Sequence, residues 1–255
     1  DGIFRNGVRA WTSQAVHAGD VIETHLVETE PSDGILPRPV PFSVVYEDDD
    51  ILVVDKPADT PIHPSIGNHE NTLANGIAWY FEQKGEPFVY RCINRLDRDT
   101  TGLIVLAKHA LSAAVLSQAM RSREIHRTYQ AFALGETAAS GTIDAPIARL
   151  DGSLIQRTVD FASGERSVTH YRTLAHCSVF SHLELNLETG RTHQIRVHMA
   201  YIGHPLLGDT LYNKTPGTFP RQALHSASLS FVHPITGEPL NFHAPLPEDM
   251  QNLLT

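Results

Sequence analysis

Apolar and polar positions along most of the chain change in short runs, a pattern typical of strands joined by turns. Two apolar runs, Ser43–Tyr46 and Ile51–Asp55, stand on either side of an acidic turn, and we expect a β-hairpin there. The same reasoning predicts further strands at Leu103–Ala107, Thr128–Leu134, Val168–Leu174, His182–Leu187, Leu229–Val232 and Leu240–His243.

Three segments have helical character. Asn71–Lys84 opens with a capping candidate and ends before Gly85, and 192–202 has helical spacing of its apolar residues. A third helix is predicted where apolar residues recur at Leu111, Val115, Leu116 and Met120. Because strands outnumber helices and several are joined by short turns, the pattern predicts the α+β class, with a mostly antiparallel, mixed β-sheet core flanked by helices.

The organisation along the chain divides at a stretch rich in proline and acidic residues. We expect a small β appendage at 1–27, a linker at 28–39 and one larger domain at 40–255. The turn signals Asn6-Gly7 and Gly19-Asp20 predict a β ribbon too short to fold alone. This piece resembles the last part of an S4-type RNA-binding module, and a plain β appendage is the alternative.

Composition limits the classes of protein to consider. Of 255 residues, 41% are hydrophobic and 19% charged, which predicts a packed core and not a disordered chain. We expect a cytoplasmic protein without membrane contact, because no apolar run reaches the length of a membrane span and no signal peptide opens the sequence. Cys92 and Cys177 lack zinc or redox spacing and are expected to be reduced thiols.

The charge balance sets a condition on any nucleic-acid partner. The chain has 20 Lys and Arg against 29 Asp and Glu, a net charge of −9, so RNA binding requires a local excess of positive charge. From Arg91 to Tyr129 there are seven basic and three acidic residues, a net of +4. This stretch permits RNA binding without requiring it, because charge runs are often solvated faces.

A dense polar cluster precedes the predicted strand at 103–107. Arg95, Asp97, Arg98 and Asp99 occupy five positions, and Gly102 then leads into the strand. Polar groups delivered to the mouth of a sheet strand are commonly catalytic. The alternative is a solvated turn whose charges pair with one another.

A second polar segment follows the predicted strand at 182–187. We expect Arg191, Thr192 and His193 in the first turn of a helix, where backbone N–H groups favour anions such as phosphate. Thr192 and Arg196 would then share a helix face. His193 and His198 are five residues apart, whereas a helical metal pair needs four, so we predict no metal site.

Five segments in order resemble the motifs of the RluA-type pseudouridine synthases: 55–57 with His63, 94–108, 125–129, 189–209 and 224–234. The resemblance extends from about residue 46 to 250. It implies the pseudouridine synthase fold and an isomerase that converts specific uridines of structured rRNA or tRNA to pseudouridine. No step of this reaction requires a cofactor, and a monomer is the default expectation. The sequence departs from the family signature at Asn94, where His is usual, and at Thr101, where Ser is commoner.

The resemblance also implies roles for individual residues. Asp97 would be the catalytic carboxylate, attacking C1′ or acting as a base, with Asp99 as the weaker candidate. Arg196 would hold Asp97 at about 2.8 Å, Tyr129 would stack on the uracil, and Arg95 would fill the space of the flipped-out uridine. The remaining expected RNA-binding residues are Arg98, Thr101, Arg121, Arg123, Arg127, Arg191, Thr192 and Gln194.

Two other functions stay open at this point. An RNA-binding module on the same fold would lack catalysis. A glycoside hydrolase could use Asp97 and Asp99, provided that the two carboxyl groups lie about 5 Å or more apart. Such a site usually presents aromatic platforms, and Trp11 and Trp79 are both distant in sequence.

Overall fold

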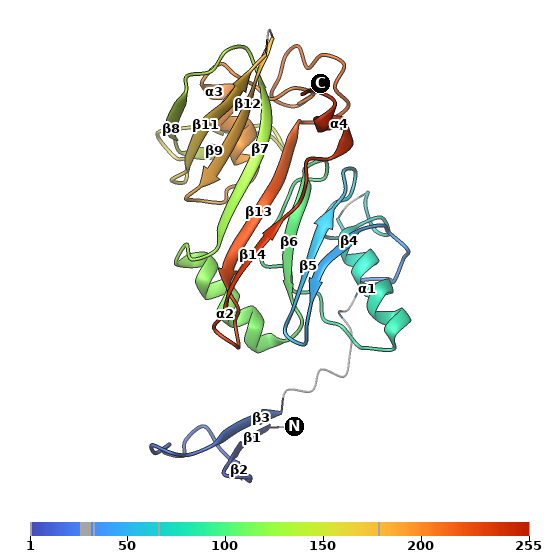
Figure 1. Ribbon diagram of the computed structural model, residues 1–255, viewed down its shortest axis with the longest axis vertical. Helices are drawn as coiled ribbons and strands as arrows, with labels where there is room; N and C mark the ends of the chain where they lie inside the picture. Colours follow the sequence, from blue (N-terminus) through green and yellow to red (C-terminus); the bar gives the residue numbers. More distant parts are fainter. Residues whose placement is uncertain (1, 26–31, 33, 66, 178, 255) are drawn as a thin grey trace.

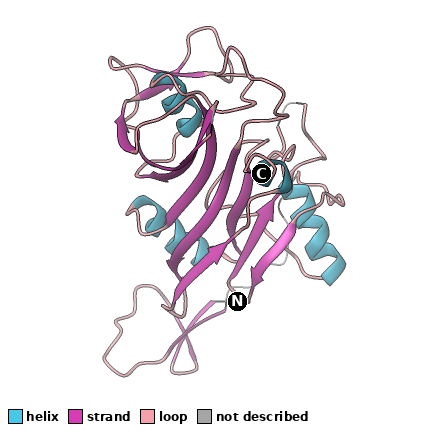
Figure 2. Ribbon diagram, turned by 45° about the horizontal axis from the view of Figure 1, so that its top comes forward, coloured by secondary structure: helices cyan, strands magenta, loops and turns pink. Residues whose placement is uncertain are grey.

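The computed structural model describes residues 2–25, 32, 34–65, 67–177 and 179–254. These residues form a nine-stranded sheet, a three-stranded sheet near the N-terminus and a two-stranded hairpin. Long strands cross the molecule and helices are few (Figures 1 and 2). The predicted α+β class is therefore confirmed. Among the described residues, no helix is long and apolar enough to cross a membrane.

The large sheet is antiparallel at every strand pair but one. Its outermost strands come from the beginning and the middle of the domain. In sheet order its strands are β4 (Ser43–Glu47), β5 (Ile51–Lys56), β6 (Thr101–Ala107), β13 (Leu224–Val232), β7 (His126–Leu134), β12 (Phe180–Leu187), β11 (Val168–His176) and β8 (Ser140–Asp144), with β14 (Pro239–His243) also paired to β13. All the strands predicted from the alternation are present.

The one parallel pair, β6 with β13, joins two halves of the sheet through only two residue pairs, Thr101 with His225 and Gly102 with Ser226. Gly102 has φ 110, and a Cβ there would lie 2.6 Å from the backbone nitrogen of Ser226. Beside it, Thr101 is buried, with its hydroxyl 2.8 Å from Nδ1 of His225. The polar cluster at 95–99 precedes β6. The candidate catalytic loop therefore joins the sheet at the contact between β6 and β13, which we call the β6–β13 seam.

The helices cover both faces of the sheet. Side chains alternate along β5, so Leu52 and Val54 face one side while Ile51 and Val53 face the other. The first side packs against α1 (Leu73–Lys84) and α3 (Gln194–Tyr201), and the second packs against α2 (Ala110–Arg121). This two-sided burial explains why β5 reads as a continuous apolar run. A short α4 (Glu248–Gln251) lies near the C-terminus.

Two helix predictions need correction. The helix predicted at 192–202 is α3, which begins at Gln194. Thr192 therefore lies outside it, and the predicted common face of Thr192 and Arg196 is wrong. The N-cap residue His193 has a left-handed backbone, φ 59, which a helical pattern in the sequence does not reveal. In α2 the expected apolar stripe is incomplete, because Leu111 and Val115 are 42% and 39% exposed.

The N-terminal β ribbon is present as three strands, β1 (Gly2–Arg5), β2 (Val8–Ala10) and β3 (Ile22–His25). Its two predicted turns contact each other: the Asn6 side chain donates to Asp20 at 2.7 Å and accepts from the Val21 N–H at 2.9 Å. Of the predicted linker, residues 28–31 and 33 lie outside the described residues.

Candidate active site

The loop that carries Asp97 has its backbone carbonyls fixed by one bond within the loop and by two bonds from distant parts of the chain. The Asp97 carbonyl accepts from the Thr100 N–H at 3.1 Å, and the Arg98 carbonyl accepts from Lys56 Nζ at 2.8 Å. The Asp99 carbonyl accepts from Arg221 Nη1 at 3.1 Å. With these groups satisfied internally, the loop has a defined shape before any substrate arrives.

Lys56 is the buried anchor of this arrangement. Its ammonium donates to the carbonyls of Pro57, Thr60 and Arg98 at 2.8, 2.9 and 2.8 Å. Burial lowers the pKa of Lys56 to about 7. The segment 55–57 is thereby joined to the loop at 97–99, which are the first and second of the motifs singled out in the sequence.

Asn94 fixes the other end of the loop to β6. Its side-chain amide donates to the Leu103 carbonyl at 3.2 Å and accepts from the Val105 N–H at 2.9 Å. This position requires one hydrogen-bond donor and one acceptor, which the amide supplies without any change of charge. The departure from the usual histidine is therefore compatible with the loop geometry.

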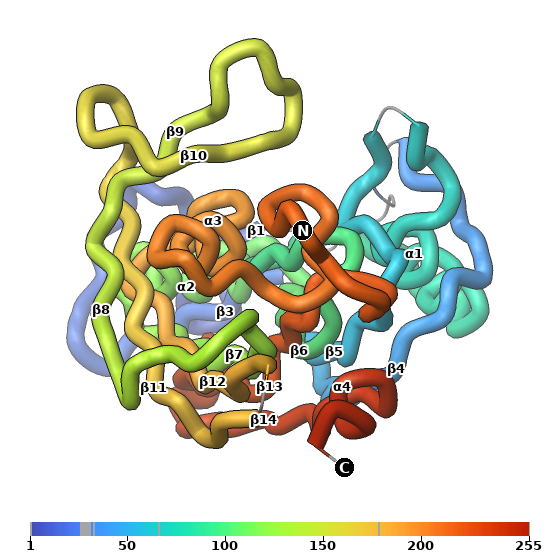
Figure 3. The backbone as a smooth tube through the Cα atoms, turned by 90° about the horizontal axis from the view of Figure 1, so that it is seen from above, coloured from blue at the N-terminus to red at the C-terminus, as the bar shows by residue number. Residues whose placement is uncertain are grey.

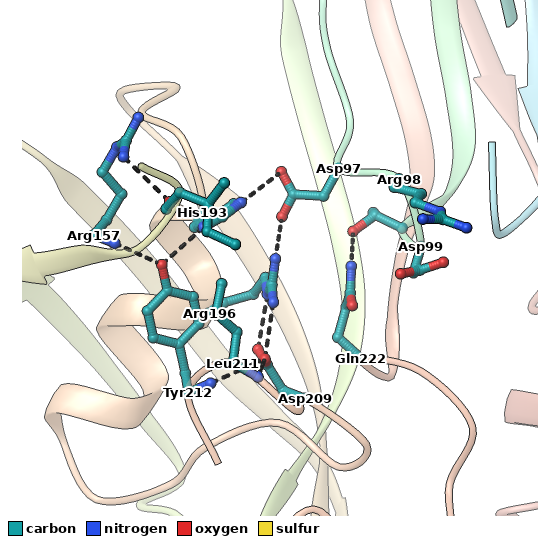
Figure 4. A network of polar contacts seen from close by, with 12 residues as sticks. Asp97, Arg98, Asp99, Arg157, His193, Arg196, Asp209, Leu211, Tyr212 and Gln222 are labelled. Atoms are coloured by element: carbon teal, nitrogen blue, oxygen red, sulfur yellow. Dashed lines mark hydrogen bonds and ion pairs between the residues drawn. The ribbon is translucent and has the colours of Figure 1, made fainter. Parts of the chain in front are cut away.

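The Asp97 carboxylate contacts a chain of buried charges (Figure 4). Arg196 donates from Nη1 to Oδ2 of Asp97 at 2.9 Å, and its other edge makes two bonds of 2.8 Å to Asp209. Burial lowers the pKa of Arg196, but the hydrogen bonds to Asp209 and the charge of Asp97 outweigh it and raise that pKa above its usual value. The arginine is thus held as a cation, and the expected contact with Asp97 is present.

His193 faces the second oxygen of Asp97. Its Nδ1 is 2.7 Å from the Tyr212 hydroxyl, which already accepts from the Arg157 N–H at 2.8 Å. The ring nitrogen Nε2 lies 3.9 Å from Oδ1 of Asp97, so the hydrogen bond at Nδ1 sets the orientation of the ring toward this carboxylate. Burial lowers the pKa of His193, which favours the neutral ring. Its left-handed backbone costs about 1 kcal/mol, a strain common at functional sites.

The space around Asp97 is a cleft with a small inner cavity. The cleft has a volume of about 770 Å³, and Arg95, Asp97, His193 and Arg196 line both it and the inner cavity of about 50 Å³. Tyr129, on β7, lines only the inner cavity. The structure thus brings together the three residues predicted to be catalytic and the arginine predicted to replace the uridine. An ionised carboxylate with one oxygen open to such a cleft can attack carbon or accept a proton.

Comparison with known proteins agrees with this arrangement. A family model described as RNA pseudouridylate synthase matches residues 50–201. The chain is 42% identical to an uncharacterized RNA pseudouridine synthase, YjbO of Bacillus subtilis, over 98% of this chain and 88% of that protein. It is 43% identical to ribosomal large subunit pseudouridine synthase D of Vibrio cholerae, over 92% and 76% respectively.

The chain belongs to the RNA pseudouridylate synthase family. The RluA-type resemblance is confirmed, and the enzyme is an isomerase that acts on RNA. Among solved structures, human RNA pseudouridylate synthase domain containing 1 superposes with a TM-score of 0.68 at 26% identity, covering 85% of this chain and 86% of that one.

The arginines predicted to bind RNA differ in whether their side chains are already paired with an acidic residue of this synthase. Arg95 is exposed at the cleft and makes no hydrogen bond or ion pair within the described residues. Arg98 pairs with Asp59, and Arg123 pairs with Glu188 at 3.1 Å. The stretch with a net charge of +4 is therefore partly neutralised by neighbours. Exposed pairs of this kind are worth about 0–1 kcal/mol, so RNA phosphates can replace them.

The other basic candidates lie at the surface in different places. Arg121 donates to Gln118 at the end of α2, and Arg191 pairs with Glu165 beside the cleft. Nε of Arg127 is buried and has no hydrogen-bond partner among the described residues, and the guanidinium would lie 3.4 Å from a Cβ at Gly190.

Two predicted RNA-binding residues are buried in the synthase. Gln194 is 3% exposed, and its amide accepts from Thr189 and Arg191 while donating to residues of β11. Thr101 is 5% exposed and bonded at the β6–β13 seam. Both side chains thus connect parts of the protein to one another. Sequence reasoning cannot separate such buried polar residues from exposed ones.

Four residues of the site network were not among the predicted site residues: Arg157, His193, Asp209 and Tyr212. Asp209 and Tyr212 lie in an irregular loop without periodicity, so only the resemblance of 189–209 to a family motif pointed near them. His193 was considered as part of an anion-binding helix start and, with His198, as a metal ligand that was then rejected. Its orientation depends on the Tyr212 hydroxyl, a contact that no local pattern encodes.

Asp99 and a second acidic cluster complete the picture of the carboxylates. The Asp99 side chain accepts from the Asp59 N–H at 3.2 Å and, among the residues that the structure describes, has no arginine partner, unlike Asp97. Among the described residues, Asp48, Asp50 and His233 have the spacing to hold a metal ion. Nδ1 of His233 accepts two backbone N–H groups, however, so Nε2 keeps its proton and donates to Asp48 at 2.9 Å. This ring orientation opposes metal binding.

Proposed function

We propose that this synthase converts one or a few uridines of large-subunit ribosomal RNA to pseudouridine, with Asp97 as the catalytic carboxylate. The observation that carries the proposal is the asymmetry of Asp97: Oδ2 is held by Arg196 at 2.9 Å, and Oδ1 faces the cleft. The choice of RNA rests on the relative from Vibrio cholerae, whose name specifies the large ribosomal subunit.

The chemistry requires breaking the bond between N1 of uracil and C1′, turning the base, and forming the bond between C5 and C1′. C5 loses a proton and N1 gains one, so the reaction needs no external oxidant or reductant. Asp97 serves either by attacking C1′ or by removing a proton beside it, and both routes require an ionised carboxylate with an accessible oxygen. Arg196 keeps this carboxylate oriented through the bond of 2.9 Å to Oδ2.

Tyr129 and Arg95 are assigned to the nucleotide. Tyr129 lies in the inner cavity with Asp97, where its ring can stack on the uracil. A uridine must leave its stack to reach this cavity, which costs a few kcal/mol. Arg95 is exposed and unpaired within the described residues, so its guanidinium is available to stack in the vacated space and offset part of that cost.

We further propose that residues 1–27 form a separate RNA-binding appendage, joined by 28–39 to the catalytic domain at 40–255, and that the enzyme works as a cytoplasmic monomer. Removing residues 1–34 is then expected to weaken RNA affinity while single-turnover rates at saturating RNA stay unchanged. Equal affinities of the two proteins for the same RNA would refute the assignment of the appendage.

The test is a pseudouridine map of total RNA from cells with and without the gene, complemented by wild type, Asp97→Asn or Asp99→Asn. We expect one or a few sites in large-subunit ribosomal RNA to vanish without the gene. Wild type and Asp99→Asn should restore them, and Asp97→Asn should not. Sites confined to transfer RNA would overturn the choice of substrate, and restoration by Asp97→Asn would overturn the catalytic assignment.

A further inference from the structure

A second polar cavity adjoins the active site. It has a volume of about 400 Å³ and lies between the hairpin of β9 (Ile147–Arg149) and β10 (Arg157–Val159) and the residues that precede α3. Seen from above, the hairpin projects from the body of the protein beside α3 (Figure 3). Arg191 lines both this cavity and the inner cavity at Asp97, so the two spaces share a wall.

The cavity concentrates positive charge in an acidic protein. Three arginines line it, Arg149, Arg157 and Arg191, against one acidic residue, Glu165, which is already paired with Arg191. Thr192 adds a hydroxyl next to the start of α3, whose N-cap makes no side-chain capping bond. Guanidinium groups, a hydroxyl and a helix N-terminus are all donors that suit a phosphate.

Two of these arginines are placed unfavourably in the absence of an anion. Arg149 and Arg157 are direct partners across the β9–β10 ladder. Like charges directly opposite each other destabilise a strand pair. Arg157 turns part of its guanidinium to the carbonyls of Ile155 and Gln156, whereas the side chain of Arg149 is exposed and makes no hydrogen bond or ion pair within the described residues. An anion bound between them would remove the repulsion.

The hairpin is also connected to the catalytic carboxylate. The backbone N–H of Arg157 donates to the Tyr212 hydroxyl, which orients His193 toward Asp97 (Figure 4). This connection runs through the backbone of Arg157 and survives changes of its side chain.

We propose that the cavity of Arg149, Arg157, Arg191 and Thr192 binds a backbone phosphate of the RNA strand next to the target nucleotide. The inference rests on the proposed function in that the ligand is the RNA substrate. It adds two arginines, Arg149 and Arg157, whose side chains bind the strand outside the pocket of the reacting base.

The experiment uses the full chain with Arg149→Gln, Arg157→Gln and the double variant. Arg172→Gln is the matched control, because Arg172 is an exposed arginine paired with Glu184 on β11 and β12. The probe is an unmodified transcript of large-subunit ribosomal RNA. KM and kcat for pseudouridine formation, RNA affinity at several salt concentrations and Tm are measured for each protein.

We expect the double variant to raise KM and Kd by about tenfold with kcat nearly unchanged, and each single variant to do so by less. The slope of log affinity against log salt should become shallower by about one, since one phosphate contact is lost. Arg149→Lys should recover part of the affinity because it keeps the charge. Tm should stay the same or rise, since the cross-strand repulsion is removed, which separates this effect from misfolding.

A double variant that matches Arg172→Gln in KM, Kd and salt slope would overturn the proposal. Failure of the proposed function looks different. In that case the wild type forms no pseudouridine in the transcript, whereas the affinity and salt slope of the variants still report whether the cavity contacts RNA.

Discussion

The strand β5 has a cluster of carboxylate and imidazole groups at each end, and the two clusters differ in one respect. At its start, Asp48 has two hydrogen bonds on each oxygen, from Tyr46, Asp50, Ile51 and His233. Near its end, Asp97 has one oxygen bonded to Arg196 and the other facing a cleft, 3.9 Å from His193.

The residue types at the two ends are nearly the same, so residue type does not distinguish them. The difference is spare hydrogen-bonding capacity next to open space. Asp48 has none left and connects the β4–β5 turn to the end of β13. Asp97 keeps one acceptor for a substrate. A reactive carboxylate in this fold is therefore recognised by an oxygen that keeps a free hydrogen-bond acceptor site next to open space.

The largest expected effect separates the two aspartates. Asp97→Asn should lower the single-turnover rate of pseudouridine formation by at least about 10³-fold with little change in stability. Asp48→Asn should leave the rate unchanged and lower the free energy of unfolding by about 1–3 kcal/mol, because buried donors lose their acceptor. Rates on ribosomal RNA and urea denaturation measure both. An Asp48→Asn enzyme with a lowered rate and normal stability would contradict the distinction between a catalytic Asp97 and a structural Asp48.

Asp209→Asn tests the buried half of the active-site network. Arg196 would lose its fully buried, bidentate carboxylate partner and keep the single bond to Asp97, and removing one partner of a buried pair costs about 3–5 kcal/mol. The rate should also fall, by about 10²-fold, because Arg196 no longer orients Asp97.

The matched control is Asp249→Asn, which removes the negative charge and one of the two oxygens that accept from Arg221 at 2.7 and 2.9 Å. Asp249 is 32% exposed, so its loss should cost about 1 kcal/mol. The free energy of unfolding of both variants is measured by urea denaturation. Equal losses would show that burial does not make the Arg196–Asp209 pair more important for stability than the Arg221–Asp249 pair.

Removal of one hydroxyl from each cluster gives a smaller effect. Tyr212→Phe takes away the group that orients His193 and should lower kcat by about tenfold. Tyr46→Phe removes a hydroxyl from Asp48 at 2.7 Å and should cost about 1 kcal/mol of stability without changing kcat. A kcat of Tyr212→Phe equal to that of Tyr46→Phe would mean that the His193 orientation is irrelevant to turnover.

The pH dependence gives the smallest signal. Burial lowers the pKa of His193 below its usual value of 6.5, so the ring is neutral down to that pH. The contribution of His193 to kcat should therefore be constant from about pH 8 to 6.5 and be lost only at lower pH. Comparison of the pH profiles of wild type and His193→Asn measures it. A ratio of the two that changes with a midpoint above 6.5 would contradict a neutral ring.

Much of the fold was predictable because strands buried on both faces leave a strong pattern. The runs at β5 and β6 are apolar throughout, and their burial against helices on both sides is the reason. The short β9 and β10 have no such run, since they form a separate two-stranded sheet that carries Arg149 and Arg157. They were missed for that reason.

The site was predictable where a residue type and its chain position decide its role. Asp97, Tyr129 and Arg196 were found through the motifs and lie around one cavity. The left-handed backbone of His193 and the partnership of Arg196 with Asp209 arise from contacts between distant segments. Such contacts leave no mark in local spacing, so the chain alone could not reveal them.

The close contact between β6 and β13 at Gly102 determines how mutations at this position behave in a genetic screen. Every substitution there adds a Cβ against the backbone of Ser226, where no side chain can move aside. A saturation screen for lost modification will therefore score position 102 as severely as position 97, five residues earlier, though for another reason. Variants at 97 leave an intact and inert enzyme, whereas variants at 102 separate the two halves of the sheet and lower the amount of folded protein. Measuring protein abundance in parallel with RNA modification distinguishes the two cases: abundance stays normal for variants at 97 and falls for variants at 102.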